Sequence, residues 1–417
     1  MFDPYAQFQT AVLTNGLTVH VLHWPERPGM RFNFGIHSGA RHDLSGKEGT
    51  AHFMEHLVSN NALVPHEELK EFFETNSGHH PHLGTTSFHS TWYGFHSSVD
   101  PDLLSTSLRY FGHMLLHSTL ENFVERERGV IIGEFNRAFP AAYQYELIRR
   151  VHLSVFPNTF LSRMSRPLGT LKSIKELAQA DLQQFYDVHY TPANMSVIGV
   201  GEFTLEQTLA FLEASPFGIA KPGIRSEAIE PITESPFPTE TLELFEEGKY
   251  VQGKTVAQYD SFAQLPGIFT SAEMRVFAHM LNKILFKEIR EERSWAYSIG
   301  CGGAHFPDFR FLHLVSDGVR LDAIEEIEEV VRVCIESLAE SESLFKTAKA
   351  AVIAQKRFGD PHVTSVANSA LQDLFFHGRV ISLAEEIQEA EKVSMDRIRQ
   401  IVTYLDPERR RTCIRHP

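Results

Sequence analysis

The chain has 417 residues, which is too long for one compact core and favours two domains of roughly 200 residues each. Its formal net charge of −14 argues against nucleic-acid binding, because phosphates require a basic surface. The acidity is compatible with basic peptide substrates, and it can equally serve solubility alone.

Cysteine usage and the N-terminal sequence bear on location. Cys301, Cys334 and Cys413 are few and widely spaced, which fits a reducing cytosol rather than a disulfide scaffold. No apolar run is long enough to cross a bilayer, so no membrane association is expected. The start, Met1 to Tyr5, resembles neither a secretory leader nor an arginine-rich presequence. We therefore expect a cytoplasmic protein.

The first half of the chain predicts strands alternating with helices. The expected elements are strands within 10–22 and 31–37, a helix from Gly49, strands within 85–98, helices at 101–117, 121–134 and 173–186, and a strand at 195–200.

The second half repeats this plan after a proline-marked linker. A capping box at Thr270 to Glu273 opens a helix that runs to about Arg290. The other expected elements are strands at 249–259, 295–301 and 309–315, a helix at 322–339, and further helices to Leu405.

These patterns predict two homologous α+β domains, each a mostly antiparallel sheet covered by helices on one face. The expected division is 1–215 for the N-terminal domain, 216–240 for the linker and 241–417 for the C-terminal domain. In this alignment the helix that starts near Gly49 and the helix that ends at Arg290 are equivalent elements.

Residues 52–56 read His-Phe-Met-Glu-His, which places three metal-chemistry side chains on one helical turn. Residues four apart share a helix face, so His52 and His56 can direct both imidazoles at one ion. Glu55 flanks the same site, where a carboxylate can polarise a metal-bound water without being a ligand. The alternative is a chance pair of exposed or core histidines.

This motif inverts the order H-E-x-x-H, so a third ligand must come from elsewhere. In the helix at 121–134, Glu127 and Glu134 are two turns apart and share a face. A buried carboxylate is costly unless it is paired or bound to a metal. This favours Glu134, drawn inward behind apolar neighbours, as the ligand and Glu127 as its supporting neighbour. The alternative is that Glu127 and Glu134 are two surface glutamates.

Glu121 and Glu125, in the same predicted helix, stand among charges and are expected in solvent. The residues expected on the apolar side of this helix are Phe123, Val130 and Ile131.

The chain resembles the pitrilysin/insulinase family of zinc peptidases, in the short two-domain form that includes mitochondrial processing peptidase subunits and bacterial homologues. The resemblance spans nearly all of residues 10–205 at family-like spacings. The segments that carry it are Asn15-Gly16-Leu17, Ser38-Gly39-Ala40-Arg41, His52 to His56, Thr91-Trp92-Tyr93, Glu127-Arg128-Gly129-Val130 with Glu134, Pro167-Leu168-Gly169-Thr170, and Tyr190 to Met195 followed by a strand and Gly201.

The resemblance implies one zinc ion per chain. It implies His52, His56 and Glu134 as the zinc ligands, Glu55 as the general base, and Glu127 as the carboxylate that supports a ligand. The expected function is that of a zinc metalloendopeptidase acting on unfolded peptides in a closed chamber. The alternative is a non-catalytic assembly subunit that keeps the fold.

A second match lies at Arg290 and Tyr297, which resemble the family's helix-end arginine and the tyrosine seven residues later. The resemblance implies that this pair approaches the zinc site from the C-terminal domain of the same or a partner chain, and steadies the oxyanion. Since one chain carries both half-sites, a homodimer is the expected assembly, and a heterodimer is the alternative.

Two segments depart from the family pattern. Leu83 and Gly84 stand where the family's substrate-side edge strand has Asn-Ala, if Thr86 holds the family's threonine position. The loop Ser59-Asn60-Asn61 lacks the usual Phe-x-Gly-Thr. Both changes concern cleavage preference more than the metal site. A further set of histidines has no complete ligand spacing and is expected to be polar strand and loop residues: His79, His80, His82, His89 and His96.

Overall fold

The computed structural model of the protein describes most of the chain. The described residues are 2–60, 64–120, 123–140, 142–157, 159–164, 166–226, 241–245, 256–306, 310–359 and 361–416.

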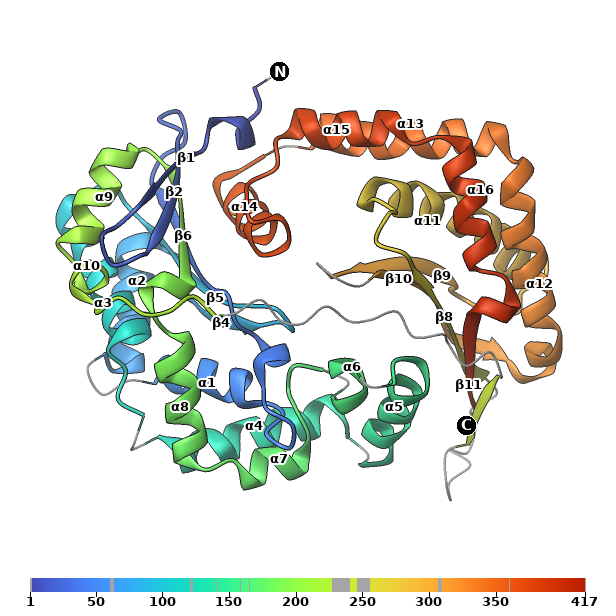
Figure 1. Ribbon diagram of the computed structural model, residues 1–417, viewed down its shortest axis with the longest axis horizontal. Helices are drawn as coiled ribbons and strands as arrows, with labels where there is room; N and C mark the ends of the chain where they lie inside the picture. Colours follow the sequence, from blue (N-terminus) through green and yellow to red (C-terminus); the bar gives the residue numbers. More distant parts are fainter. Residues whose placement is uncertain are drawn as a thin grey trace. The chain divides into compact units, whose positions relative to one another are not determined.

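The chain forms two compact units, each assembled from separate segments of the sequence (Figure 1). Unit 1 consists of Met1–Pro140, Arg163–Ile229 and Asp360–Leu383, and unit 2 consists of Ala141–Ser162, Glu230–Gly359 and Ala384–Pro417.

Unit 1 is built on a six-stranded sheet with the order β1-β2-β6-β3-β5-β4. Only β2 and β6 pair in parallel, and the other neighbours are antiparallel. The strands are β1 (Gln9–Val12), β2 (Thr18–His23), β3 (Met30–Ile36), β4 (His82–Thr86), β5 (Thr91–Ser97) and β6 (Met195–Gly201). The central strands β3 and β6 are buried along their whole length, so both faces of the sheet need cover.

Helices from distant parts of the sequence cover the two faces of this sheet. The helices of unit 1 are α1 (Thr50–Val58), α2 (His66–Ser77), α3 (Pro101–Leu116), α4 (Val124–Ala138), α7 (Leu171–Glu176), α8 (Gln179–His189), α9 (Leu205–Glu213), α10 (Pro216–Ile219) and α14 (Val363–His377). On one face, Phe34 stacks on Phe111 of α3 and Phe217 of α10. On the other face α14 packs so closely that a Cβ on Gly35 would lie 2.6 Å from the Leu371 side chain.

Unit 2 is built on a five-stranded sheet with the order β7-β11-β8-β10-β9. Its strands are β7 (Leu242–Phe245), β8 (Val256–Leu265), β9 (Gly300–His305), β10 (Arg310–Arg320) and β11 (Arg410–His416). Its helices are α5 (Ala142–Val155), α11 (Ser271–Leu285), the π-helical turn η4 (Phe286–Glu291), α12 (Ile324–Ser337), α13 (Glu342–Phe358) and α16 (Met395–Tyr404). The remaining helices, at the borders of the units, are α6 (Phe160–Arg163) and α15 (Leu383–Lys392).

The unit 2 sheet is also covered on both faces. On one face, a core around Phe277 and Met280 joins α11 to the strands and to α12, α13 and α16. On the other face, just after α5, the ring of Phe156 lies 5.6 Å from that of Phe262 and 4.9 Å from that of Phe311.

The two sheets share one topology. The order β7-β11-β8-β10-β9 reproduces β2-β6-β3-β5-β4, with a single parallel pair followed by three antiparallel pairs. α1 follows β3 in the chain as α11 follows β8, so these helices are equivalent elements as predicted. The predicted fold class, two homologous α+β domains with mostly antiparallel sheets, is confirmed.

The sequence did not predict that a helix from each half of the chain packs on the sheet of the other half. Helices therefore cover both faces of each sheet rather than one. The predicted contiguous division at 215 and 240 does not describe this exchange of residues 141–162 and 360–383. Of the predicted linker, residues 227–240 lie outside the described residues, and its first residues form α10, which packs on α3.

Several element boundaries differ from the predictions. Residues 10–22 form a hairpin with a turn at Gly16, which has φ +89°. The helix predicted at 173–186 is divided into α7 and α8. The strand predicted at 295–301 begins only at Gly300, after Ser294, the one described non-glycine residue with positive φ. The strand predicted at 249–259 begins at Val256, and residues 249–255 lie outside the described part.

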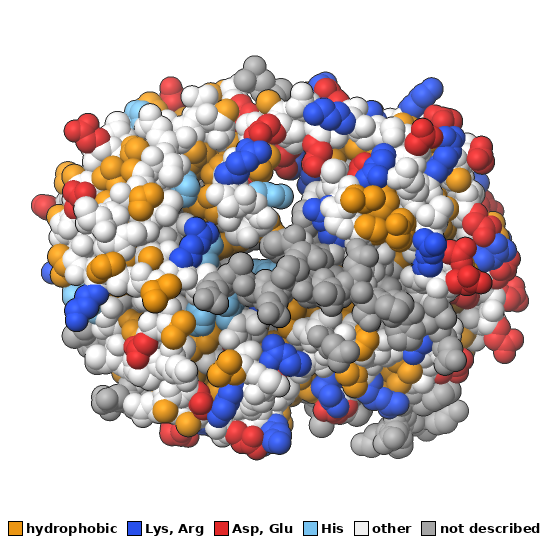
Figure 2. Space-filling view, in the orientation of Figure 1, with side chains coloured by type: hydrophobic (Ala, Val, Ile, Leu, Met, Phe, Trp, Pro, Cys, Tyr) orange, Lys and Arg blue, Asp and Glu red, His pale blue; other side chains and the backbone are white. Residues whose placement is uncertain are grey.

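Among the described residues, no helix combines the length and apolarity that a membrane span requires. Acidic and basic side chains are interspersed over the surface seen in Figure 2. Acidic ones are frequent along the edge where α12 lies, and its exposed carboxylates are Glu325, Glu326, Glu329 and Glu336.

Candidate metal centre

The start of α1 is fixed by a buried carboxyl group. The side chain of Asp43 accepts hydrogen bonds from the N–H groups of Gly49 at 2.7 Å and Ala51 at 2.9 Å. These are donors that the first turn of a helix would otherwise leave without partners. Burial raises the pKa of Asp43 to about 8, although the two backbone donors oppose the rise.

Two glycines bring a second segment against the same helix start. A Cβ on Gly49, which has φ +95°, would lie 2.8 Å from the carbonyl oxygen of Leu168. A Cβ on Gly169, which has φ +82°, would lie 2.3 Å from that of Glu48. The hydroxyl of Ser173 also donates to the Glu48 carbonyl at 2.5 Å. The segment around Leu168 and Gly169 therefore packs directly against the start of α1.

From this fixed start, α1 turns a half-buried face toward α4. Its buried side chains are Thr50, Ala51, Phe53, Met54, Leu57 and Val58. The remaining face carries His52, Glu55 and His56, as the i, i+4 spacing predicts. The ring centroids of His52 and His56 lie 4.8 Å apart.

Glu134 on α4 completes a cluster with the two histidines. Its Oε2 lies 3.6 Å from Nε2 of His52 and 3.5 Å from Nε2 of His56. These separations are too long for good hydrogen bonds. They match the spacing of about 3.4 Å expected between ligand atoms around a tetrahedral ion with bonds of about 2.1 Å. Among the described residues, no other set of three His, Cys, Asp or Glu side chains is placed to share a metal ion.

Glu127 lies two turns before Glu134 and contacts the far side of one imidazole. Its Oε2 is 3.3 Å from Nδ1 of His56, and its side chain is only 4% exposed, against 30% for Glu134. A carboxylate on the distal ring nitrogen orients a ligating histidine and fixes its tautomer. Nδ1 of His52 is buried and has no hydrogen-bond partner in the described part of the chain.

The two imidazoles differ in their electrostatic surroundings. Burial lowers the pKa of His52 to about 3, and the neighbouring His56 adds to the effect. Burial also acts to lower the pKa of His56, but the hydrogen bond to Glu127 and the charges of three carboxylates outweigh it and raise that pKa. A metal ligand must be neutral imidazole, so protons and a metal compete at His56.

Glu55 is held against the edge strand β4. The Thr86 hydroxyl donates a 2.6 Å hydrogen bond to Oε2 of Glu55. A Cβ on Gly84 would lie 2.4 Å from Oε1, so only glycine leaves room for this carboxylate. Burial raises the pKa of Glu55, and the Thr86 hydrogen bond and His56 partly oppose the rise.

The residues present fit a zinc ion. A His₂Glu donor set is one that catalytic zinc sites use, with a fourth position left for water or substrate. The Glu127 carboxylate, which contacts His56, and the half-buried Glu55 supply the surroundings that such a site requires.

The structure brings together most of the residues selected from the sequence. His52, Glu55, His56, Glu127 and Glu134 form one site in unit 1.

Three expectations on α4 met different outcomes. Val130 was expected on the apolar side, but it is 44% exposed, because the buried stripe runs through Val124, Glu127, Ile131 and Phe135. Glu125 is exposed as predicted. Glu121 lies outside the described residues.

Asp43, Gly84 and Thr86 were missed as contributors to the site. Their roles depend on tertiary contacts for which the sequence carries no local signal. Gly84 and Thr86 lie in the edge-strand segment that departs from the family pattern. The Glu55 carboxylate packs against Gly84 and accepts a hydrogen bond from the Thr86 hydroxyl.

Arg290 and Tyr297 lie together in unit 2. The Arg290 guanidinium stacks over the Tyr297 ring at 4.6 Å and over the Phe286 ring at 4.7 Å. Arg290 lies in η4, and Tyr297 is 79% exposed, so a polar hydroxyl and a guanidinium are presented side by side. Their approach to the zinc site stays a prediction.

The other histidines of the first half have different partners. His82 stacks on Trp92 with ring centroids 3.9 Å apart, and His79 lies 4.7 Å from His96. His96 also contacts the Thr364 hydroxyl of α14 at 3.2 Å.

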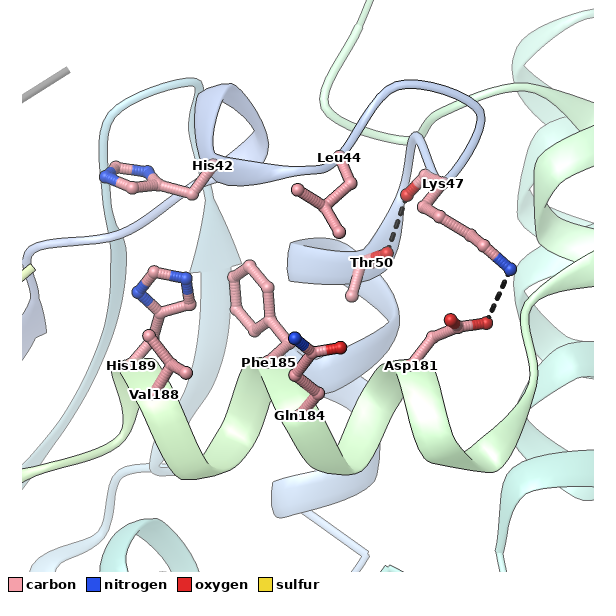
Figure 3. A pocket seen from close by; sticks show the side chains of 9 residues that line it. All are labelled: His42, Leu44, Lys47, Thr50, Asp181, Gln184, Phe185, Val188 and His189. Atoms are coloured by element: carbon pink, nitrogen blue, oxygen red, sulfur yellow. Dashed lines mark hydrogen bonds and ion pairs between the residues drawn. The ribbon is translucent and has the colours of Figure 1, made fainter.

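A separate pocket of about 170 Å³ lies beside the first turn of α1 and contains none of the metal donors (Figure 3). The rings of His42 and His189 lie at one end, and the Lys47–Asp181 ion pair, 2.7 Å long, lies at the other. Burial lowers the pKa of His42 to about 3 and that of His189 to about 4, so both rings are neutral.

The fold and the donor set together define a chain of two homologous α+β units with a candidate metal site in unit 1. Two family models match it in succession: "Insulinase (Peptidase family M16)" at residues 25–165 and "Peptidase M16 inactive domain" at residues 176–352. The chain belongs to this insulinase (M16) family, as the sequence resemblance predicted.

Curated relatives match about half of the length of the chain. The mitochondrial-processing peptidase subunit beta of Blastocladiella emersonii is 29% identical over 194 residues, which cover 46% of this chain and 40% of the relative. The subunit beta of Saccharomyces cerevisiae is 26% identical over 206 residues, covering 49% and 43%. The matched region thus spans about two fifths of the length of these relatives.

Solved structures share the whole fold. A protease from Helicobacter pylori has a TM-score of 0.81 at 18% identity, covering 98% of this chain and 99% of that one. The first half of the periplasmic protease PqqL from Escherichia coli has a TM-score of 0.76 at 19% identity, covering 98% and 92%.

Proposed function

We propose that this chain is a zinc-dependent metalloendopeptidase that hydrolyses unfolded peptides or short polypeptides in a closed chamber, with one zinc ion per chain. The observation that carries the proposal is the cluster of His52, His56 and Glu134, with donor atoms within 4.8 Å of one another. Glu55 beside it supplies the second requirement of a hydrolase, a group that can carry a proton.

A zinc ion held by these three residues would supply Lewis acidity toward a water molecule and the scissile carbonyl. Glu55 accepts the proton that the attacking water loses and delivers it to the leaving amine. Burial raises the pKa of Glu55, which brings the carboxyl nearer to the pH at which proton uptake and release are both efficient. Glu127 keeps the His56 ring in one orientation throughout.

Arg290 and Tyr297 complete the proposed site. The guanidinium is a permanent donor fork and the phenol a neutral donor, and both suit the negative charge that develops on the carbonyl oxygen. Their mutual stacking keeps two donors on one surface. In the proposal they act on a substrate bound at the zinc site of the same or a partner chain.

The proposal is tested with quenched fluorescent peptides of mixed sequence. Glu55→Gln is expected to retain zinc and to lower hydrolysis by at least ~100-fold, the lower range for loss of a general acid–base group. The matched control is Glu125→Gln, an exposed carboxylate on α4, which should behave as the unsubstituted protein. Undiminished turnover in Glu55→Gln would rule out Glu55 as the base.

A second candidate function is that of a non-catalytic assembly subunit. It is favoured by the match of residues 176–352 to a model described as an inactive domain. Against it, all the metal donors lie within the match at 25–165, and a subunit freed from catalysis has no physical need to retain them. Zinc-loaded protein that cleaves no member of a diverse peptide library would support this candidate.

Partners and location belong to the same proposal. The relatives are named as subunits, which agrees with an assembly of more than one chain. Because this chain carries both half-sites, we propose a homodimer, with a heterodimer as the alternative. We propose a cytoplasmic location on the ground of cysteine usage.

A further inference from the structure

The edge strand β4 contains an irregularity directly beside the metal-binding helix. His82 pairs with Gly94 and Thr85 pairs with Trp92, so three steps along β4 correspond to two steps along β5. The extra residue falls at Leu83 and Gly84 and forms a β-bulge. Bulges of this kind redirect the side chains that follow them.

The bulge decides which threonine faces α1. Because side chains alternate along a strand, a regular pairing from His82 onward would place Thr85 opposite Thr91. The observed register places Thr86 there instead, and the Thr86 and Thr91 hydroxyl oxygens lie 3.4 Å apart. Thr85 is exposed and contacts the His82 ring at 3.0 Å.

The bulge also provides the space in which Glu55 lies. Gly84 has φ +151°, and a Cβ there would lie 2.3 Å from Cγ of Glu55 and 2.6 Å from Cδ. The Thr86 hydroxyl holds Oε2 of the same carboxylate at 2.6 Å. The carboxylate is therefore confined by backbone on one side and by a hydrogen bond on the other.

We propose that Gly84 and Thr86 are positioning residues for Glu55, placed by the bulge at Leu83–Gly84. The inference rests on the proposed role of Glu55 as the base. Gly84 leaves room for the carboxylate, and Thr86 fixes its orientation before a peptide binds. A base confined in advance does not have to be ordered during the reaction.

The first test uses metal-free protein and needs no activity. Gly84→Ala and Thr86→Val are each made alone and together with Glu55→Ala, and Tm is measured. The backbone strain of an alanine at φ +151° is common to both backgrounds and cancels in the comparison. The loss of Tm from Gly84→Ala should be smaller by about 3 °C or more when the Glu55 side chain is absent.

If Gly84→Ala fails to fold, the proposal is tested by Thr86→Val, compared with and without Glu55→Ala. Valine matches threonine in shape, so its cost in the presence of Glu55 reports the lost hydrogen bond. Equal Tm losses with and without the Glu55 side chain in these cycles would overturn the proposal. Thr85→Val is the matched control and should show no dependence on Glu55.

The second test separates positioning from general damage in the zinc-loaded protein. Thr86→Val should lower kcat about 10-fold or more with little change in KM and zinc content, since a hydrogen bond to a charged group is lost. Thr86→Ser should recover most of the rate. Full activity in Thr86→Val, or no recovery in Thr86→Ser, would contradict the proposal. If the unsubstituted protein cleaves nothing, the proposed function fails and the Tm cycles still decide the positioning.

Discussion

At the scale of residues, the two glutamates of α4 have different surroundings although they share one helix face. Glu127 is almost fully buried and contacts the distal nitrogen of His56, whereas Glu134 is partly exposed and faces the proximal nitrogens of both histidines. A buried carboxylate needs a partner, and an imidazole N–H supplies one. This arrangement makes Glu134 the expected ligand and Glu127 the residue that orients a ligand.

Metal content should separate these roles. His56→Ala or Glu134→Gln is expected to reduce zinc from about one ion per chain to near zero, because two ligands cannot form a closed site. Glu127→Gln should retain zinc with an affinity about 10- to 100-fold weaker, the usual cost of losing an orienting partner. Zinc is measured by elemental analysis after gel filtration and by competition with a chelator.

The exposed Glu125→Gln, on the same helix, is the control and should bind zinc normally. Full occupancy in both His56→Ala and Glu134→Gln would show that the ion is held elsewhere.

The sequence indicated which side chains cluster here because the decisive spacings are local. His52 and His56 are four apart, and Glu127 and Glu134 are seven apart, so helix geometry alone places each pair on one face. The contact of Glu55 with Thr86 could not be predicted in the same way. It depends on a bulge that shifts the register by one residue, and alternation along a regular strand would have selected the neighbouring threonine.

At the scale of elements, the position of α1 depends on backbone that approaches it from a distant segment. Gly49 and Gly169 allow the two backbone segments to approach each other closely, and Asp43 supplies the cap. Such contacts give the segment at Leu168 and Gly169 a role at the start of α1, although this segment holds no metal donor. The placement of the candidate metal donors on α1 is thus linked to the stability of this part of unit 1.

Gly169→Ala should therefore disturb α1. Its Cβ would lie 2.3 Å from the Glu48 carbonyl oxygen at φ +82°. Gly46→Ala is a matched control, since Gly46 also has φ +82° but nothing lies within 4 Å of its Cβ position. The free energy of unfolding of the control should fall by about 1 kcal/mol because of backbone strain. That of Gly169→Ala should fall by about 2 kcal/mol more because of the clash.

Denaturant unfolding of metal-free protein measures both losses, and zinc occupancy should fall only in Gly169→Ala. Equal losses in the two variants would mean that the approach of the two segments does not hold the helix start.

Strand β2 offers a test of acid stability. Burial lowers the pKa of His20 to about 4 from 6.5, while His23 at the end of the strand is exposed. Above pH 6.5 the His20 ring is neutral in both folded and unfolded chains. Between pH 6.5 and 4 only the unfolded chain takes up the proton, so this contribution to stability is lost as the pH falls. The loss is at most about 3 kcal/mol.

The free energy of unfolding of metal-free protein should thus depend less steeply on pH below 6.5 in His20→Asn. The pH slope is compared rather than the stability itself, because His20→Asn also removes the contact with the Thr10 hydroxyl at 2.8 Å. An unchanged slope in His20→Asn would show that the ring takes up its proton in the folded protein over the same pH range as in the unfolded chain.

At the scale of the whole molecule, the two halves of the sequence are interdependent. α14 brings a set of buried side chains to the unit 1 sheet, and these are Val366, Ala367, Ala370, Leu371 and Leu374. In return, residues 141–162 belong to unit 2. Local sequence patterns predicted these helices but not the sheet on which each one packs, because an amphipathic stripe fits either sheet.

The division of the proposed site between units leads to a test of assembly. The metal donors and Glu55 lie in unit 1, and Arg290 and Tyr297 lie in unit 2. In a homodimer with shared sites, each active site would take its base from one chain and its oxyanion donors from the other. Two-fold pairing is the commonest assembly of soluble chains.

Glu55→Gln and Tyr297→Phe proteins, each inactive or nearly so, should regain activity when mixed under conditions that allow subunit exchange. In a random mixture about half of the chains pair as mixed dimers. If sites are shared, each mixed dimer holds one site with both an intact Glu55 and an intact Tyr297, and the other site lacks both. The recovered rate should then approach about a quarter of the unsubstituted rate. Mixed dimers demonstrated by differential tags yet without activity, or a fully active monomer in sedimentation, would show that each chain builds its site alone.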